Sequence, residues 1–231
     1  MTDLPFVSAL VQAELPVWEQ CLQTEFLQKL ENGTLSEDCF KSYLVEDSLY
    51  LREYAKIFAW GMTKATTMAA VRTYYSLLSF VQENEDLTRL RYLEQYGLRE
   101  ADIQSLPLRP ESRAYLDCMI DAARTGEGEA ECLMACLPCM LSYGWIFGEL
   151  IRRCPGVKDT PYWPFVRDYA GNQYETVCEQ WADFTNAVCR DLEPERKERC
   201  REIFYQCSVH ELHFWEMSAR PRADLPPLTI A

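Results

Sequence analysis

The sequence Phe40-Lys-Ser-Tyr-Leu-Val-Glu-Asp-Ser-Leu-Tyr-Leu-Arg-Glu-Tyr54 indicates how the whole chain is built. Its Tyr43, Asp47, Tyr50 and Tyr54 are spaced at i, i+4, i+7 and i+11, so they lie on one face of an α-helix. The same period of 3.6 residues recurs along the chain, whereas alternating runs of Val, Ile and Thr are scarce. The sequence therefore predicts an all-α protein.

Capping and turn residues divide this periodic pattern into a series of helices. Asn32-Gly33 and Gly97 are typical of helix C-termini, and Ser36 is typical of an N-cap. Two prolines within residues 98–110 indicate a long connection there. The predicted helices cover residues 5–30 with a bend near Pro16, 36–64, 67–82, 85–96, 111–124, 129–153, 160–170, 173–191 and 194–219.

Length and composition favour one domain. The chain has 231 residues, of which 48% are hydrophobic and 13% aromatic. A folded chain of this length buries roughly 70% of its unfolded surface and can enclose a small-molecule site. We therefore predict a single helical domain over residues 1–220, followed by a loosely ordered, proline-rich C-terminal tail over residues 221–231.

The balance of charge argues against nucleic-acid and membrane partners. Lys and Arg number 23 against 36 Asp and Glu, so the net charge is -13, which repels phosphate backbones and anionic lipids. The start of the chain, Met1–Pro5, shows no pattern of a secretory signal, and we expect a cytoplasmic protein. The uncharged run 132–148 falls short of the roughly 20 apolar residues that a membrane span needs. We predict that it is a buried core helix.

Asp47 is the carboxylate within the tyrosine face formed by Tyr43, Tyr50 and Tyr54. One interpretation is structural, because the carboxylate can accept hydrogen bonds from neighbouring tyrosines or face water. The other is functional, because a carboxylate among aromatic rings can bind a flat heterocycle that donates hydrogen bonds.

The apolar run contains Cys132, Cys136 and Cys139, spaced at i, i+4 and i+7. A thioredoxin-like redox pair needs a βαβ setting, and a zinc or iron-sulfur site needs a further ligand, and the sequence offers neither. Two interpretations stay open: buried apolar cysteines, or a single nucleophilic thiol. The chain has 11 cysteines, but without an export signal we expect no disulfide scaffold.

The predicted last helix carries both histidines of the chain in His210-Glu211-Leu212-His213. Their spacing of three rather than four residues excludes the HExxH zinc-protease motif. A di-iron site needs Glu-x-x-His, and no Glu stands three residues before either histidine. Glu211 shares a helix face with Phe214, so it can point into the protein.

Taken together, these segments resemble the TenA family, the thiaminase II enzymes. The resemblance covers nearly the whole chain. It runs through residues 24–35, 40–51, 137–143, 165–169 and 211–217, in the order that the family shows.

The resemblance implies particular roles for eight residues. The thiol nucleophile of the family falls on Cys139, and its catalytic glutamate falls on Glu211. Its pyrimidine-binding aspartate falls on Asp47. The aromatic residues of the substrate site fall on Tyr50, Tyr115, Tyr143, Tyr169 and Phe214.

The resemblance also implies a fold and an activity. The fold is a heme-oxygenase-like helical bundle, and we expect Asp47, Cys139 and Glu211 to converge in a pocket between helices 36–64, 129–153 and 194–219. The activity is that of a cysteine-dependent aminopyrimidine aminohydrolase, which converts 4-amino-5-aminomethyl-2-methylpyrimidine to the hydroxymethylpyrimidine for thiamine salvage, with thiamine as a second candidate substrate. The alternative is a pyrimidine-binding or regulatory protein that does not turn its ligand over.

The expected partners are the small pyrimidine and further copies of the chain. We predict no cofactor and no metal. Heme in particular would need a histidine near the first helix, and both histidines lie near the C-terminus. Members of the TenA family are often homotetramers. The many Phe, Trp and Tyr residues would also leave aromatic surface exposed on a monomer. We therefore expect a dimer or a tetramer.

Overall fold

The computed structural model describes residues 4–225, apart from the side chains of residues 80–86. Within this part of the chain every regular element is a helix and there is no strand, which confirms the all-α prediction. The elements are α1 (Phe6–Cys21), α2 (Glu25–Glu31), α3 (Glu37–Lys64), α4 (Met68–Gln95), α5 (Glu100–Ile103), α6 (Pro110–Thr125), α7 (Glu129–Arg153), the 3-10 helix η1 (Pro155–Asp159), α8 (Trp163–Tyr169), α9 (Asn172–Cys189) and α10 (Pro194–Ser218).

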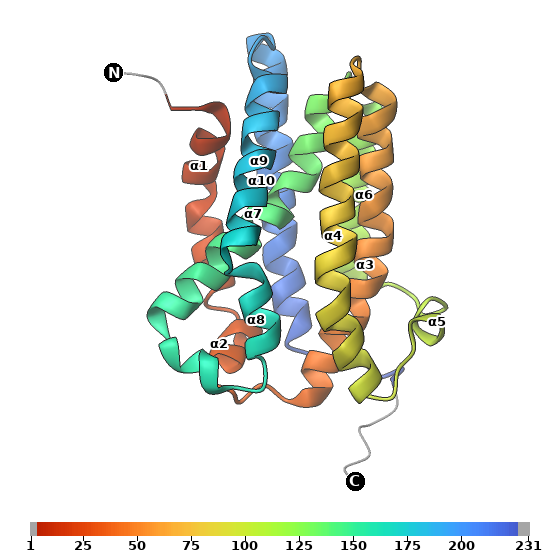
Figure 1. The fold of residues 1–231 in the computed structure, drawn as a ribbon, viewed down its shortest axis with the longest axis vertical. Helices are drawn as coiled ribbons and strands as arrows, with labels where there is room; N and C mark the ends of the chain where they lie inside the picture. The colour runs from red at the N-terminus through yellow and green to blue at the C-terminus, as the bar shows by residue number, and fades with distance from the viewer. Residues whose placement is uncertain (1–3, 226–231) are drawn as a thin grey trace.

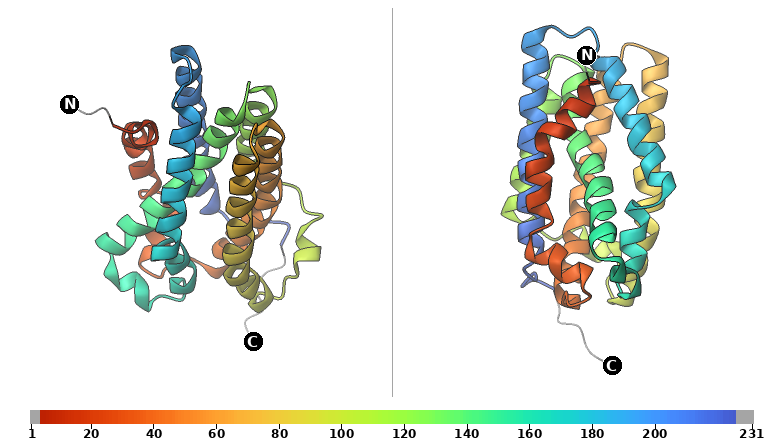
Figure 2. Two further views of the ribbon diagram at one scale, coloured as in Figure 1. Left: turned by 45° about the horizontal axis from the view of Figure 1, so that its top comes forward. Right: turned by 90° about the vertical axis from the view of Figure 1, so that its left-hand side faces the viewer.

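The long helices stand side by side as a bundle, and the short helices α2 and α8 lie near one end of it (Figure 1). Helix α7 is the central element, because it packs against α1, α3, α6, α9 and α10. The left view of Figure 2 shows α1 and α9 on one side of the bundle and α3 and α4 on the other, and in its right view α1 and α9 face the viewer. Residues far apart in the sequence therefore meet along α7.

The central position of α7 explains its apolar sequence. By length and composition this helix could cross a membrane, but 78% of its most apolar window is buried inside the protein. Pro138 lies within the helix and removes one backbone donor, so the helix continues with one hydrogen bond fewer. The structure thus confirms that residues 132–148 belong to a core helix.

Several predicted helix ends are confirmed. Gly33 and Gly97 have φ values of +74° and +71°, which is the left-handed conformation that glycine adopts without strain after a helix. The Ser36 hydroxyl accepts a hydrogen bond from the backbone N–H of Cys39 at the start of α3. The Thr67 hydroxyl does the same at the start of α4.

The predicted first helix, residues 5–30, is wrong as a single element. Pro16 lies inside α1, and the chain breaks after Cys21 instead. The Thr24 hydroxyl and the Thr24 backbone N–H both bond to the Cys21 carbonyl, at 2.7 and 3.0 Å. These local bonds close a tight turn that competes with helix continuation.

The predicted helices 67–82 and 85–96 are one continuous helix, α4. The intervening polar residues include neither glycine nor proline, so the backbone has no reason to break there. The predicted connection 98–110 contains the single turn of α5. The helix predicted over residues 160–170 is shorter in the structure, where α8 begins at Trp163.

The start of the predicted C-terminal tail is held to the bundle rather than loosely ordered. Arg222 is only 7% exposed and forms ion pairs with Glu46 of α3 and with Asp224, the latter at 2.7 Å. Glu46 is fully buried, so its charge needs this cation nearby. Residues 226–231 of the predicted tail lie outside the described residues.

Candidate active site

The tyrosine face of α3 points into the bundle. Tyr43, Asp47, Tyr50 and Tyr54 are 0%, 6%, 3% and 2% exposed, as their spacing predicts for an inward face. The Tyr43 hydroxyl lies 3.1 Å from the hydroxyl of Tyr143 on α7. Asp47 is therefore a buried carboxylate among aromatic side chains, and it does not face water.

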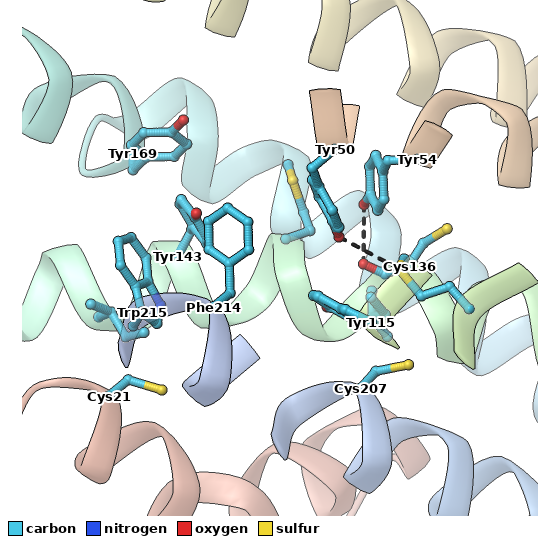
Figure 3. Packing of buried hydrophobic residues seen from close by; sticks show 14 of the residues in the cluster. Cys21, Tyr50, Tyr54, Tyr115, Cys136, Tyr143, Tyr169, Cys207, Phe214 and Trp215 are labelled. Atoms are coloured by element: carbon cyan, nitrogen blue, oxygen red, sulfur yellow. Dashed lines mark hydrogen bonds between the residues drawn. The ribbon is translucent and has the colours of Figure 1, made fainter. Parts of the chain in front are cut away.

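The three cysteines of α7 have different surroundings. Cys132 and Cys136 are 1% and 3% exposed, and burial raises the pKa of both thiols. The Cys136 carbonyl accepts a 3.0 Å hydrogen bond from Tyr54 (Figure 3). Cys139 is only half-buried, and it lines a small cavity.

The cavity lies between α3, α7, α8 and α9. It is small, about 10 Å³, which is room for about one water molecule. Its lining comes from α3, α7, α8 and the start of α9, and consists of Asp47, Leu51, Tyr54, Cys139, Met140, Tyr143, Tyr169 and Tyr174. The prediction that helices 36–64 and 129–153 wall the pocket is confirmed, whereas α8 and α9 complete this lining in place of the predicted last helix.

Glu211 and Tyr115 form a buried pair next to this lining. Each residue is 1% exposed, and the Tyr115 hydroxyl donates a 3.0 Å hydrogen bond to Oε2 of Glu211. Burial raises the pKa of Glu211 to about 8, the hydrogen bond from Tyr115 opposes this shift, and the negative charge of Asp47 adds to it. The Glu211 carboxyl is therefore protonated at neutral pH, as a general acid must be.

Aromatic rings connect the Glu211 pair to the cavity. The ring of Tyr50 lies 5.3 Å from that of Tyr115 and 5.7 Å from that of Phe214, measured between centroids. Tyr143 and Tyr169 are 5.0 Å apart on the cavity wall. The ring of Trp215 lies 6.5 Å from that of Phe214 and 5.0 Å from that of Tyr143, so the rings form one continuous cluster (Figure 3).

Tyr143 lies near enough to all three predicted polar residues to be influenced by each. Burial raises the pKa of Tyr143, and smaller contributions come from Tyr43, Glu211, Asp47 and Cys139. Asp47, Cys139 and Glu211 thus act on one phenol from three helices. All eight site residues named from the sequence lie in or beside this cluster, and none lies on an outer face of the bundle.

Sequence reasoning missed Tyr174 and Met140. Tyr174 lies in the first turn of α9, is 3% exposed, and donates a 3.0 Å hydrogen bond to the Met140 carbonyl. Its position follows Tyr169 across the sharp turn at Gly171, and no periodic pattern links the two. A second space of about 320 Å³ lies on the other side of Tyr169 and Tyr174, which line both. We call this second space the outer groove.

The histidines lie apart from the cavity lining. His210 is half-buried and stacks on Tyr115, with ring centroids 5.6 Å apart and an interplanar angle of 12°. His213 is exposed. Among residues 4–225, no group of three or more His, Cys, Asp or Glu side chains could hold a metal ion. The chemistry available in the cluster is that of a thiol, two carboxyl groups and phenols.

Several known proteins are similar to this chain. The family model described as TENA/THI-4/PQQC matches residues 12–221. An uncharacterized protein of Haemophilus influenzae is 30% identical over 211 residues, which is 91% of this chain and 97% of the relative. A protein of Halalkalibacterium halodurans named aminopyrimidine aminohydrolase is 24% identical over 220 residues, covering 95% of this chain and 97% of the relative. The crystal structure of a TenA family transcription regulator from Silicibacter superposes with a TM-score of 0.82 at 22% identity, over 94% of this chain and 97% of the other.

Proposed function

The chain belongs to the TENA/THI-4/PQQC family, and from that premise we propose that it is an aminopyrimidine aminohydrolase. In the proposed reaction, water replaces the amine on the exocyclic methylene of 4-amino-5-aminomethyl-2-methylpyrimidine, and ammonia and the hydroxymethylpyrimidine leave. The product is then available for thiamine salvage. The name of the Halalkalibacterium relative supports a hydrolase of this kind.

The observation that carries the proposal is the shared cavity of Asp47 and Cys139. A buried carboxylate and a half-buried thiol line one small cavity together with four tyrosines, Leu51 and Met140. The carboxylate can accept hydrogen bonds from a ring amine, and the thiol is the strongest nucleophile among ordinary side chains. A protein that only binds a pyrimidine has no need of the thiol.

Substrate entry in this proposal requires the cavity to widen. A space of about 10 Å³ holds about one water molecule, which is less than a substituted pyrimidine occupies. Rotation of Tyr169 and Tyr174 would join the cavity to the outer groove, because both rings line both spaces. The pyrimidine would then stack among the aromatic rings while Asp47 accepts a hydrogen bond from its exocyclic amine.

We assign the covalent step to Cys139. Its thiolate adds to an electrophilic ring carbon, and a ring nitrogen takes up a proton as the ring loses its aromaticity. The electron pair of the ring then expels the amine from the exocyclic methylene. Water adds to the methylene, and departure of the thiolate restores the aromatic ring. Sulfur suits both ends of this sequence because it is a good nucleophile and a good leaving group.

We assign proton transfer to Glu211. Its pKa of about 8 keeps the carboxyl protonated at pH 7, so it can donate a proton to the ring nitrogen during thiol addition. The hydrogen bond from Tyr115 fixes the orientation of the carboxyl group. General acid catalysis of this kind contributes about 10² to 10⁴-fold to a rate.

Incubation with the aminomethylpyrimidine tests the proposal directly. The purified protein should release ammonia and form hydroxymethylpyrimidine in equal amounts, with Cys139→Ser as the control for contaminating activity. The alternative, a non-catalytic binding protein, predicts that the pyrimidine binds in calorimetry but that ammonia is released no faster than in buffer. That outcome would refute the enzymatic proposal.

A further inference from the structure

Two thiols meet behind the Tyr115 and Glu211 pair, on the side away from the cavity. Cys118 lies one turn after Tyr115 on α6, and Cys207 lies one turn before Glu211 on α10. The two helices pack against each other in antiparallel register, because Ser112 contacts Met217, Tyr115 contacts Glu211 and Cys118 contacts Gln206. This register sets Cys118 opposite Cys207, and each thiol influences the pKa of the other.

The third member of this group is His210. Its ring stacks on Tyr115, one turn before Cys118, and its side chain influences the pKa of the Cys118 thiol. Cys118 is half-buried and its thiol lies 3.8 Å from the exposed Gln206 side chain, whereas Cys207 is fully buried. A small reagent in solution can therefore reach Cys118 first.

The surroundings favour the ionised form of one thiol only. The neighbouring Cys207 and His210 side chains lower the pKa of Cys118 to about 5, although burial and Asp121 oppose this. The pKa of Cys207 lies well above its ordinary value, because Cys118 and burial both raise it. A thiolate beside a protonated thiol is the arrangement of an attacking and a resolving cysteine.

We propose that Cys118 and Cys207 form a peroxide-reactive site, in which Cys118 is oxidised first and a disulfide then joins α6 to α10. The Cys118 thiolate attacks a peroxide oxygen, so that an S–O bond forms, the O–O bond breaks and hydroxide leaves for hydrogen peroxide. Cys207 then attacks the sulfur of the Cys118 sulfenic acid. The S–S bond forms as the S–O bond breaks, and the thiol proton of Cys207 leaves with the hydroxyl group as water. Peroxide is the oxidant in this sequence, and a dithiol reductant reverses it.

The location of the site suggests its effect. Each cysteine is one turn from a member of the Tyr115 and Glu211 pair, so a covalent bond of about 2.05 Å between the sulfurs pulls the two helix turns together. This changes the geometry of a 3.0 Å hydrogen bond next to the cavity. We expect the disulfide to slow hydrolysis. This effect rests on the proposed function, whereas formation of the disulfide does not depend on it.

The chain holds a second thiol pair that serves as an internal control. The thiols of Cys189 in α9 and Cys200 in α10 also influence each other's pKa, and both residues are 0% exposed. Since peroxide has no access to either sulfur, this pair should stay reduced while Cys118 reacts. If only Cys118 and Cys207 are oxidised, the access of peroxide to a sulfur determines the reaction, and the presence of two neighbouring thiols does not suffice.

Peptide mass spectrometry tests the site without any substrate. Cleavage after Arg and Lys places Cys118 alone in residues 114–124 and Cys207 alone in residues 202–222. After brief treatment of Cys139→Ser protein with hydrogen peroxide, these two peptides should be linked by a disulfide, and Cys189 and Cys200 should remain free thiols. In Cys207→Ala protein, Cys118 should stop at the sulfenic acid, which dimedone traps.

The pH dependence of the reaction gives a second signature. Oxidation of Cys118 should be nearly constant between pH 6 and pH 8, whereas an ordinary thiol of pKa about 8.5, such as a free cysteine peptide, should slow by about seventyfold at the lower pH. Cys118 that is oxidised no faster at pH 6 than this peptide would overturn the proposal. Sulfinic acid on Cys118 beside a reduced Cys207 would overturn it as well.

The effect on activity has its own comparison. Cys118→Ser should keep the basal rate of hydrolysis, lose the disulfide and become less sensitive to peroxide than Cys154→Ser, in which another half-buried thiol is removed far from α6. Any oxidation of Cys139 is common to both variants. If the disulfide forms but the protein shows no hydrolysis, the proposed function fails and the peroxide site stands.

Discussion

Tyr115 on α6 donates a 3.0 Å hydrogen bond to Oε2 of Glu211 on α10, and both side chains are almost completely buried. Burial raises the pKa of Glu211, and this hydrogen bond is the contribution that lowers it. The bond therefore sets the pH at which the carboxyl loses its proton. Loss of this hydrogen bond should therefore change the pH dependence of any reaction that uses Glu211 as an acid.

We expect Tyr115→Phe to move the alkaline limb of the pH profile. Without the phenol, the carboxylate loses its hydrogen bond and the pKa of Glu211 rises above about 8. The decline of kcat/KM with rising pH should then occur at higher pH than in the wild type. Glu211→Gln should lower kcat by about a hundredfold or more and abolish this limb. An alkaline limb that is unchanged in Tyr115→Phe would exclude Glu211 as the acid.

Glu211 also predicts how stability depends on pH. Below pH 4.5 the carboxyl is protonated in both the folded and the unfolded chain, so it favours neither. Between pH 4.5 and about 8 the unfolded chain releases the proton and the folded chain keeps it, so the free energy of unfolding falls by up to about 5 kcal/mol. Glu211→Gln cannot ionise. Its melting temperature should exceed that of the wild type at pH 8 and approach it near pH 4.

Cys139 and Cys136 provide a matched pair for the nucleophile. Cys139→Ser should fold normally, bind the pyrimidine and turn over at least about a hundredfold more slowly, because a hydroxyl is a far weaker nucleophile than a thiolate. Cys136→Ser removes a buried thiol one turn away and should leave the rate nearly unchanged. Steady-state ammonia release measures both variants. Equal rates in the two would mean that Cys139 is only a half-buried cysteine.

Asp47→Asn should weaken pyrimidine binding. The amide keeps the shape of the side chain but can turn an NH₂ group toward the NH₂ of the ligand. Loss of a charged hydrogen bond costs roughly 1.5 to 3 kcal/mol, which is about a tenfold to hundredfold change in Kd. Glu53→Gln removes one carboxylate from the same helix outside the cavity lining, so its Kd in calorimetry should match the wild type.

Exposed apolar side chains predict self-association. Trp60 near the end of α3 is 40% exposed, and Met68 and Tyr75 in the first part of α4 are 63% and 67% exposed. We propose that these residues contribute to an interface between copies of the chain. Sedimentation should show a species heavier than the 26.9 kDa chain, and Tyr75→Glu should shift it toward the monomer. Tyr205→Glu, on α10, is the control for a change of charge alone.

Helical periodicity predicted the faces of α3 and α10 that carry Asp47 and Glu211, because a helix that covers a core repeats its inward positions every 3.6 residues. The same argument could not distinguish Cys139 from Cys136. Helix α7 packs against neighbours on several sides, so nearly all its positions are apolar and its spacing does not indicate which one meets a cavity. Only the resemblance to the TenA family separated the two cysteines.

Other features depend on contacts between distant segments, which a local pattern does not contain. Tyr174 completes the cavity because α9 crosses α7 near Met140, and the thiol pair of Cys118 and Cys207 exists because α6 packs on α10. The break after Cys21 depends on one threonine side chain that satisfies a carbonyl locally. Contacts between distant segments and local side-chain bonds thus decide between arrangements that helical periodicity alone does not distinguish.

The pairing of Glu46 with Arg222 has a consequence for the timing of folding during synthesis. The two residues are 176 positions apart, and Glu46 directly precedes the carboxylate that lines the cavity. At about 5 to 20 residues per second, a ribosome needs roughly ten to thirty seconds to reach Arg222 after Glu46. Until then Glu46 can pair only with partners such as Arg109 and lacks the cation of Arg222, so α3 docks less stably. The cluster of Asp47, Cys139 and Glu211 should therefore become stable only after synthesis of nearly all the described chain, and ribosome-bound shorter chains should be inactive.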